Sequence, residues 1–394
     1  MVLEPDITVL VGRNDTGKSS LVNALWVYGQ VAADGFRALM RDRGPVGADA
    51  PTFRTQWRDD RTGELYDHII SPTRGRLRES LAGPFGECTW DPRDRVLRWG
   101  RKRYEADGIP RLASLGSVAP SEWRSETDVP DELSECLGLA RGFSTPVPYL
   151  FEPSMLAHRT TKDFVTTDRN GLGWANLLQE VLNRRDRSME RLEAGLKSLF
   201  PFFRSVALVE EQLFRYTRVV GADARFRGEL LRPGPRPKDD DPQLERALRF
   251  QVETRGSGAR RPVRKWVSAE SMSSGLLLAA AYLTAAYAAP EGSLVVLEEP
   301  ENGLNRILVR NMMERFLEVV QQRKQQLIMT THNEFWLDYV GPDRIRVVTR
   351  DESGSHVWAA SDNMRKLQEE GFALSEVMAV GGPEQLIEER RCRP

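Results

Sequence analysis

The chain has 394 residues, which is enough for two or three domain-sized units or for one catalytic domain that carries large insertions. Apolar residues make up 40% of the sequence and charged residues 29%, as in an ordinary soluble protein with a hydrophobic core. Because the net charge is only −1, the chain as a whole has no general attraction for nucleic acid or for an anionic membrane. Any such contact has to come from a local patch.

Targeting and redox signals are sparse. No stretch approaches the ~20 apolar residues of a membrane-spanning helix, and the N-terminus shows no secretory signal. The Ala-rich residues 275–290 come nearest, and they predict a short helix packed in the core. Three cysteines and four histidines are scattered along the chain, which is typical of a reducing compartment and argues against a structural zinc site. We therefore expect a cytoplasmic protein without a membrane contact.

A phosphate-binding loop follows the first apolar stretch. Residues 7–11 predict a buried strand, residues 12–19 read Gly-Arg-Asn-Asp-Thr-Gly-Lys-Ser, and residues 21–25 begin a helix, which is the order of a P-loop. Glycines let the backbone wrap around phosphates, and the N–H groups of the loop and helix attract an anion. Lys18 can reach the β- and γ-phosphates, and the Ser19 hydroxyl can coordinate Mg²⁺. The sequence therefore predicts a nucleoside triphosphate site made by Gly12, Arg13, Asn14, Asp15, Thr16, Gly17, Lys18, Ser19 and Ser20.

The next part of the chain predicts a β layer. Residues 35–61 contain many arginines, glycines and prolines and read as a loop-rich excursion. Three later segments, 64–71, 87–90 and 95–104, alternate apolar with polar residues and are separated by turn residues. This pattern is typical of short antiparallel strands, and we expect them to form a side layer.

The middle of the chain changes to helical periodicity. Apolar residues recur at helical spacing over residues 173–199 and predict two helices. Residues 206–220 alternate like a pair of strands, and residues 233–243 read as a polar linker. The acidic run Asp239–Asp241 in this linker is more typical of a solvated loop tip than of a metal site.

The last third of the chain alternates helices with fully apolar strands. After a predicted hairpin at 247–267 and the apolar helix 276–289, the strand 293–298 ends in the carboxylates Glu298 and Glu299. A helix then leads to the strand 326–331, which His332 follows. Such a pattern predicts a parallel sheet covered on both faces, with ligands at the carboxyl ends of its strands. The P-loop, the two acids and His332 all occupy such ends, so we expect one active site.

These side chains match the needs of γ-phosphate hydrolysis, which are charge stabilisation, Mg²⁺ and an oriented water. Glu298 is suited to hold the metal, through a water ligand, and Glu299 is suited to polarise the attacking water. His332 is suited to donate to the γ-phosphate. The competing interpretations are acids that only compensate a helix dipole and a histidine that is only structural.

The same residues carry a family resemblance. Residues 12–19, Ser273-Ser274-Gly275, the run 297–304 (Leu-Glu-Glu-Pro-Glu-Asn-Gly-Leu) and Thr330-Thr331-His332 resemble the ABC-type ATPases of the RecF/SMC/OLD-like group. The run 297–304 is close to the Walker B and D-loop of stand-alone members from bacterial DNA-repair and antiphage operons. Met272 to Leu276 resembles the signature motif, with Ser274 in place of its first glycine.

The resemblance implies an α/β P-loop ATPase with a mostly parallel core sheet flanked by helices, an antiparallel β side layer and an inserted helical lobe. It implies ATP and Mg²⁺ as cofactors, and a head-to-tail homodimer or higher even oligomer in which Ser273, Ser274 and Gly275 of one chain close on the nucleotide of the other. We expect the N-terminal half of the ATPase head at residues 1–110, a helical or mixed lobe at 111–243, and the C-terminal half of the head at 244–394.

The sequence departs from the family pattern at three places. Asp15 stands where transporter ATPases usually have glycine, and Asn305 stands where histidine is common. Only six residues precede the P-loop strand, whereas relatives normally have another strand first. Either the sheet edge is shorter in this protein or the true start lies upstream.

Several functions fit these motifs to different degrees. The best fit is an ATPase whose ATP-bound dimer gates a separate effector protein, in antiphage defence or DNA repair. The alternative is a nucleotide-gated scaffold with negligible turnover. Nucleic acid is a further candidate partner, because the arginine-rich stretches 54–61, 98–103 and 255–264 could meet phosphates, although solvated loops explain them equally well.

Other nucleotide-dependent classes fit less well. The segment from Lys18 to Ser273 is about twice as long as in transporter ATPases. The residues after His332 are too few for the metal domain of an OLD-type nuclease, and the Asn-Lys-x-Asp motif of guanine-selective GTPases is missing from the sequence.

Overall fold

The computed structural model describes residues 6–34, 52–58, 63–73, 76–84, 86–91, 94, 96–106, 123–124, 148–161, 167–212, 216–218, 231–233, 244–254, 262–359 and 361–387. Residue contacts divide the chain into two units. Unit 1 comprises Met1–Pro148, Glu291–Val296 and Lys324–Pro394, and unit 2 comprises Tyr149–Pro290 and Leu297–Arg323. The three-part division with boundaries at residues 110 and 243 remains a prediction.

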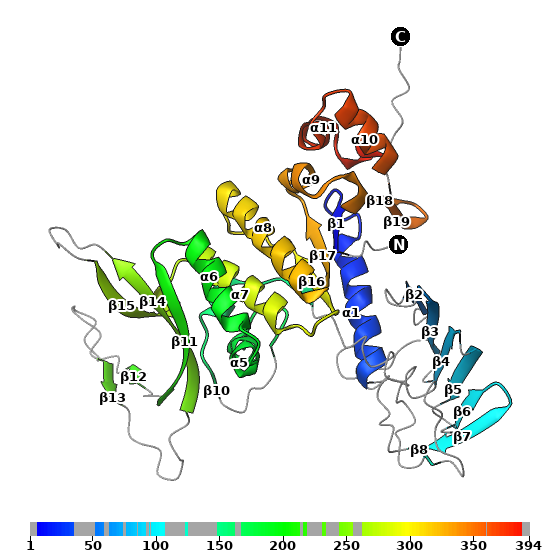
Figure 1. Ribbon diagram of the computed structural model, residues 1–394, viewed down its shortest axis with the longest axis horizontal. Helices are drawn as coiled ribbons and strands as arrows, with labels where there is room; N and C mark the ends of the chain where they lie inside the picture. Colours follow the sequence, from blue (N-terminus) through cyan, green and yellow to red (C-terminus); the bar gives the residue numbers. More distant parts are fainter. Residues whose placement is uncertain are drawn as a thin grey trace. The chain divides into compact units, whose positions relative to one another are not determined.

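A central sheet of apolar strands organises unit 1. Its strand β1 (Ile7–Val11) lies between β17 (Gln326–Thr331) and β18 (Ile345–Asp351) and runs parallel to both (Figure 1). On the far side of β18 the antiparallel strand β19 (Gly354–Trp358) follows, and β16 (Leu294–Glu298) comes next after β17. All five residues of β1 are buried. The α/β architecture and the predicted core strands are confirmed.

The helix of the P-loop closes one core of this sheet. Helix α1 (Lys18–Asp34) places Val22 against apolar side chains of four strands. These are Leu10, Val296, Ile328 and Val348, with Leu21 and Leu25 packed beside them. These strands end at the edge of the sheet where the P-loop follows β1. Packing against them therefore holds the start of α1 at this carboxyl edge.

Short helices follow the last core strands of unit 1. They are α9 (Phe335–Val340), η4 (Pro342–Arg344), α10 (Ser361–Glu369), α11 (Leu374–Gly381) and η5 (Pro383–Leu386). Trp336, Met364, Leu374 and Leu386 are fully buried among them, so this part of unit 1 has its own apolar packing.

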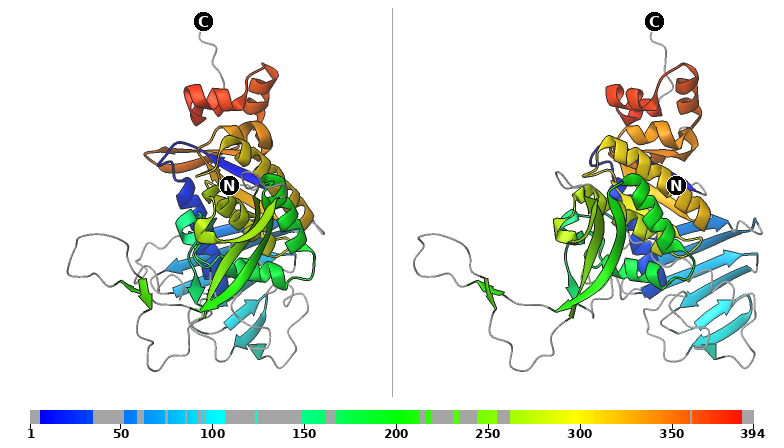
Figure 2. Two further views of the ribbon diagram at one scale, coloured as in Figure 1. Left: turned by 90° about the vertical axis from the view of Figure 1, so that its left-hand side faces the viewer. Right: turned by 60° about the vertical axis from the view of Figure 1, so that its left-hand side comes forward.

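The second sheet of unit 1 is an antiparallel ladder in which each strand pairs with the next one along the chain (Figure 2, right view). Its strands are β2 (Phe53–Arg58), β3 (Leu65–Thr73), β4 (Arg76–Gly83), β5 (Gly86–Asp91), β6 (Val96–Trp99), β7 (Lys102–Ala106) and β8 (Trp123–Arg124). The predicted β side layer is confirmed. The loop expected over residues 35–61 is wrong at β2, where Phe53, Thr55 and Trp57 alternate with polar residues and pair with β3.

A buried polar chain joins α1 to this antiparallel sheet. The hydroxyl of Tyr28 lies 2.7 Å from Nδ1 of His68, and Nε2 of the same ring lies 2.6 Å from Oε1 of Glu79. Burial raises the pKa of Tyr28 above its usual range, so its phenol keeps its proton and can donate to Nδ1. The ring then donates from Nε2 to the carboxylate of Glu79. Buried polar groups satisfied in this way fix the orientation of the P-loop helix.

Unit 2 begins near β9 (Pro148–Tyr149) and contains a helical layer. Its helices are α4 (Pro153–Leu156), α5 (Ala175–Asn183), α6 (Ser188–Leu199), α7 (Ser274–Ala288) and α8 (Arg306–Arg323), with the 3₁₀ turn η3 (Ala269–Ser271) before α7. Helix α7 is buried along its whole length from Leu276 to Ala288, and it contacts α4, α5, α6 and α8. Figure 1 shows α7 beside α5 and α6. The predicted helices in 173–199 and the core helix in 275–290 are confirmed.

Two arginines bind the carbonyl end of α7. Arg184 donates from Nη2 to the carbonyl oxygen of Ala288, and Arg323 donates from Nη2 to that of Ala289 at 2.9 Å. Cations at a helix C-terminus interact favourably with its dipole, and these bonds also satisfy carbonyls that lack helical partners. This holds α5 and α8 against α7.

The sheet of unit 2 has β14 (Leu244–Thr254) at its centre. Strand β11 (Phe203–Gln212) pairs with one edge of β14, and β10 (Thr160–Thr161) and β15 (Val263–Ser268) pair with it as well. The hairpin predicted at 247–267 is confirmed. The strand pair predicted at 206–220 is wrong in its pairing, because β12 (Tyr216–Arg218) pairs with β13 (Leu231–Pro233) and not with β11. The acidic run 239–241 lies outside the described residues.

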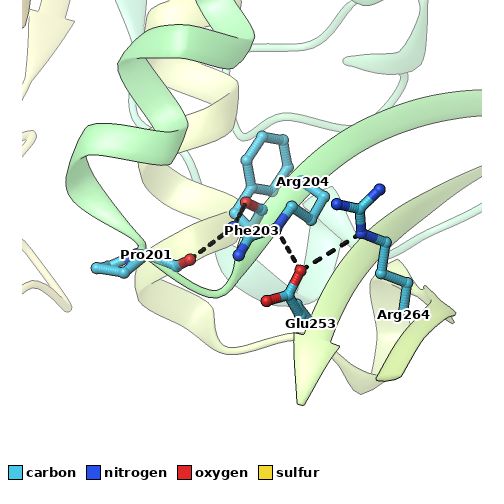
Figure 3. A network of polar contacts seen from close by, with 5 residues as sticks. All are labelled: Pro201, Phe203, Arg204, Glu253 and Arg264. Atoms are coloured by element: carbon cyan, nitrogen blue, oxygen red, sulfur yellow. Dashed lines mark hydrogen bonds and ion pairs between the residues drawn. The ribbon is translucent and has the colours of Figure 1, made fainter. Parts of the chain in front are cut away.

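An ion-pair network ties three segments of this sheet together (Figure 3). Glu253 of β14 accepts from Nε of Arg204 on β11 at 2.8 Å and from Nε of Arg264 on β15 at 3.4 Å. Arg204 also donates from Nη1 to the carbonyl oxygens of Pro201 and Phe203. The hydrogen bond from Arg204 is the main cause that lowers the pKa of Glu253. The network fixes the register of β11 and β15 on β14.

Candidate nucleotide site

The P-loop is closed by its own lysine. Lys18 is 5% exposed, and its Nζ donates to the carbonyl oxygens of Gly12 at 2.7 Å and Arg13 at 2.9 Å. The hydroxyl of Thr16 donates to the same Arg13 oxygen at 2.9 Å. These hydrogen bonds hold the loop in a closed curve around the ammonium group of Lys18. The described geometry is that of an anion-binding loop at the start of a helix of 17 residues.

Backbone conformation explains the residues at two positions of this loop. Gly17 has φ +99°, which side chains rarely adopt, and a Cβ there would overlap Oγ of Ser355. Asp15 has φ 64°, a left-handed conformation that a short polar side chain tolerates better than most. The departure from glycine at Asp15 is therefore compatible with the loop.

The C-terminal part of unit 1 also contacts the P-loop, and sequence reasoning did not identify these contacts. Arg350 at the end of β18 donates from Nη1 to the carbonyl oxygen of Asp15 at 3.3 Å. Nε of Arg13 lies 3.3 Å from a carboxylate oxygen of Glu384 in η5. These residues are hundreds of positions from the loop and carry no motif that could have revealed them.

His332 lies beside the P-loop lysine. Val11 of β1 pairs with Thr331 of β17, so the loop and His332 leave the sheet at the same edge. Nδ1 of His332 is 3.4 Å from Nζ of Lys18. Because an ammonium can only donate, Nδ1 has to accept, and the ring proton is then on Nε2. Two residues predicted from separate motifs thus meet, and the histidine offers an N–H donor.

The two predicted carboxylates have different surroundings within unit 2. Glu298 is the last residue of β16, is 2% exposed, and forms an ion pair with Arg169. Glu299 is partly exposed and has φ 43°, and its carboxylate accepts from Nδ2 of Asn302 at 2.6 Å. The main-chain N–H of Asn302 also donates to the carbonyl oxygen of Glu299, at 2.9 Å. The sharp turn after β16 therefore separates a buried acid from an accessible one.

The hydroxyl of the buried Tyr282 lies near these acids. Tyr282 of α7 accepts a hydrogen bond from the main-chain N–H of Phe151 at 3.2 Å. Burial, with the nearby carboxylates of Glu301, Glu298 and Glu299 as further causes, raises the pKa of Tyr282 above its usual range. The phenol of Tyr282 therefore remains protonated.

The predicted signature residues form the start of α7. Ser273 is the N-cap, Ser274 and Gly275 open the helix, and both serines are exposed. Neither packing nor backbone conformation requires glycine at position 275, because a Cβ there would be 3.4 Å from Leu308 and 3.7 Å from Leu304, at ordinary contact distance. The helix N-terminus is thus accessible to an outside group.

Unit 1 holds the P-loop and His332, and unit 2 holds Glu298, Glu299 and the start of α7. Strand β16 passes from one unit to the other, since Val296 belongs to the core beneath the P-loop helix and Glu298 ends the strand. Within the described part of the chain, no group of three His, Cys, Asp or Glu residues could hold a metal by itself. No helix among those residues is long and apolar enough to cross a membrane.

Solved structures similar to this chain include heads of SMC proteins. The head bound to the C-winged helix domain of ScpA is 13% identical with a TM-score of 0.42, and the match covers 91% of each chain. The head with an extended coiled coil bound to the C-terminal domain of ScpA from Pyrococcus furiosus is 13% identical with a TM-score of 0.43 over 94% of each chain. The head from Thermotoga maritima is 15% identical with a TM-score of 0.35 over 91% of each chain.

Among curated proteins, none matches the sequence. One family model matches residues 7–338, from the P-loop strand to α9, and it is described as "AAA domain, putative AbiEii toxin, Type IV TA system". The match spans most of the chain and contains every site residue predicted from the sequence. The protein therefore belongs to this family of AAA-domain proteins.

Proposed function

We propose that this protein binds ATP with Mg²⁺ and hydrolyses it to ADP and phosphate. The observation that carries this proposal is the pair formed by Lys18 and His332 at the carboxyl edge of the parallel sheet. A lysine held over the P-loop and a histidine N–H beside it are suited to the charge of a γ-phosphate. Family membership supports the same reaction.

The donor set of the chain fits a triphosphate with its metal. A Cβ at Gly12 would overlap the carbonyl oxygen of Val348 and Oγ1 of Thr16, so only glycine lets this end of the loop pack against β18. The hydroxyl of Ser19 is a hard oxygen ligand of the kind that Mg²⁺ prefers, and the carboxylate of Glu298 would hold the metal through a water ligand. The metal, when bound, neutralises charge on the β- and γ-phosphates.

The remaining side chains are assigned by their chemistry. Glu299 would orient the attacking water and take its proton, because it is the more exposed of the two acids and its turn is held by Asn302. His332 would donate from Nε2 to the γ-phosphate. Arg13, Asn14, Asp15, Thr16, Gly17 and Ser20 would complete the phosphate loop.

Continuous release of inorganic phosphate tests this proposal. The wild-type protein with ATP and Mg²⁺ is expected to release many phosphates per chain, and excess EDTA is expected to stop the release. If ATP binds but no more than one phosphate per chain is released at any protein concentration, the proposed catalytic turnover is wrong. The nucleotide-gated scaffold then becomes the better description.

We further infer that ATP joins two chains, with Ser273, Ser274 and Gly275 of one chain closing on the nucleotide of the other. The exposed start of α7, with no side chain capping it, supports this inference because free helical N–H groups attract a phosphate. The ATP-bound assembly would gate a separate effector, in antiphage defence or DNA repair. We propose a cytoplasmic location, on the basis of the few scattered cysteines.

A further inference from the structure

A buried carboxylate at the end of an apolar strand requires compensation of its charge. Glu298 is such a group, with its side chain 3% exposed, and the guanidinium of Arg169 forms an ion pair with it. The distance in sequence is 129 positions, and both residues belong to unit 2. Removing one partner of a buried ion pair is strongly destabilising, so this contact matters for the placement of the Glu298 side chain.

The loop that carries Arg169 is rigid at its backbone. The carbonyl oxygen of Arg169 accepts from the N–H of Leu150, and that of Asn170 accepts from the N–H of Glu152, both at 2.9 Å. Gly171 closes the loop with φ +99° and a main-chain hydrogen bond to Asp168 at 2.9 Å. The Cα of Arg169 is therefore held in place.

The side chain of Arg169 is less restricted than its backbone. It is 34% exposed, whereas the carboxylate that it binds is almost fully buried. Nε of this side chain is buried, so the exposed fraction lies on its other atoms. A long, partly exposed arginine side chain can turn toward solvent or toward another anion without unfolding its loop. In this ion pair, the side chain of Arg169 can therefore change its position, while the side chain of Glu298 stays in place.

We propose that Arg169 occupies Glu298 while no metal is bound and yields this carboxylate to Mg²⁺ when the nucleotide enters. This rests on the proposed function, in which Glu298 serves the metal. A guanidinium and a divalent cation repel each other, so both cannot use one buried carboxylate without loss of affinity. Arg169 is then a positioning residue that holds the side chain of Glu298 in place before the metal arrives, at the expense of metal affinity.

The test is the Mg²⁺ concentration that gives half-maximal binding of the non-hydrolysable analogue AMP-PNP, measured by calorimetry or by a fluorescent derivative. We expect Arg169→Ala to lower this concentration by roughly fivefold or more, in the range of ordinary coupling between two binding events. Arg169→Gln retains most of the stem and serves as a second variant if the alanine protein is unstable. Arg169→Lys keeps the charge and is expected to stay within about twofold of the wild type.

Two controls separate this effect from a general loss of charge. Arg159 is also 34% exposed and pairs with Glu270 in the same unit, so Arg159→Ala should leave the Mg²⁺ dependence unchanged. In a Glu298→Gln background, Arg169→Ala should lose its effect, because the competition requires both charges.

The outcomes are distinct. If Arg169→Ala and Arg169→Gln leave the half-maximal Mg²⁺ concentration within twofold of the wild type, or raise it, the exchange of partners is wrong. If the wild-type protein binds no AMP-PNP at any Mg²⁺ concentration, the proposed function itself fails. Wild-type binding without any Mg²⁺ dependence contradicts the role of Glu298 and of Arg169 together.

Discussion

Replacing Lys18 with alanine is expected to weaken ATP binding by at least about 100-fold. Charge-assisted hydrogen bonds are worth roughly 1.5–3 kcal/mol each, and a lysine that contacts two phosphates loses two of them. Since 1.4 kcal/mol corresponds to a factor of about 10, the combined loss exceeds two orders of magnitude. Isothermal titration calorimetry with ATP and Mg²⁺ measures the effect directly.

Lys197→Ala is the matched control for this variant. Lys197 is 45% exposed on α6 and pairs with Glu193, so its removal should leave ATP affinity unchanged. The thermal midpoint of Lys18→Ala also has to be measured, because Lys18 bonds two carbonyl oxygens of its own loop. ATP affinity within about threefold of the wild type in a folded Lys18→Ala protein would contradict the assigned phosphate site.

Glu299→Gln is expected to slow ATP cleavage by about 100- to 1,000-fold and to change ATP affinity little. General base catalysis contributes about 10²–10⁴ in rate, and an amide cannot accept the proton of the attacking water. The glutamine oxygen can still accept from Asn302, so the turn after β16 should survive. Single-turnover phosphate release gives the chemical step, and titration with AMP-PNP gives the affinity.

The control for this second substitution is Glu314→Gln. Glu314 is 53% exposed on α8 and pairs with Arg310 one helical turn earlier, and its loss should leave cleavage at the wild-type rate. A Glu299→Gln protein that cleaves ATP as fast as the wild type would assign the water-orienting role to another group. Reduced binding with unchanged cleavage would instead place Glu299 in nucleotide binding.

The parts of this fold that could be predicted are those with local signals. The P-loop, the apolar strands β1, β16 and β17, and the helix α7 combine a contiguous motif with an uninterrupted hydrophobic period. Their order along a parallel sheet also placed His332 beside the loop, as the structure confirms through its contact with Lys18.

Pairing over long distances could not be predicted in this way. The alternation of residues 206–220 indicates strands. A repeat of two residues does not, however, identify the neighbouring strand in the sheet, and β11 pairs with β14, which follows only after a long intervening segment. Arg169 was missed for the same reason, because an isolated arginine has no motif that links it to Glu298. Strand β2 was missed because its arginines gave the segment a loop-like composition.

The solution mass of Glu299→Gln with and without ATP and Mg²⁺ tests most directly whether the nucleotide joins and releases two chains. Slow cleavage should trap the ATP-bound form, so the mass is expected to double when ATP is added. Ser273→Arg in the same background should prevent this, while the exposed Ser198→Arg on α6 should not. A mass that never changes with ATP, either because the chain stays monomeric or because it sits in a fixed assembly, would contradict the account.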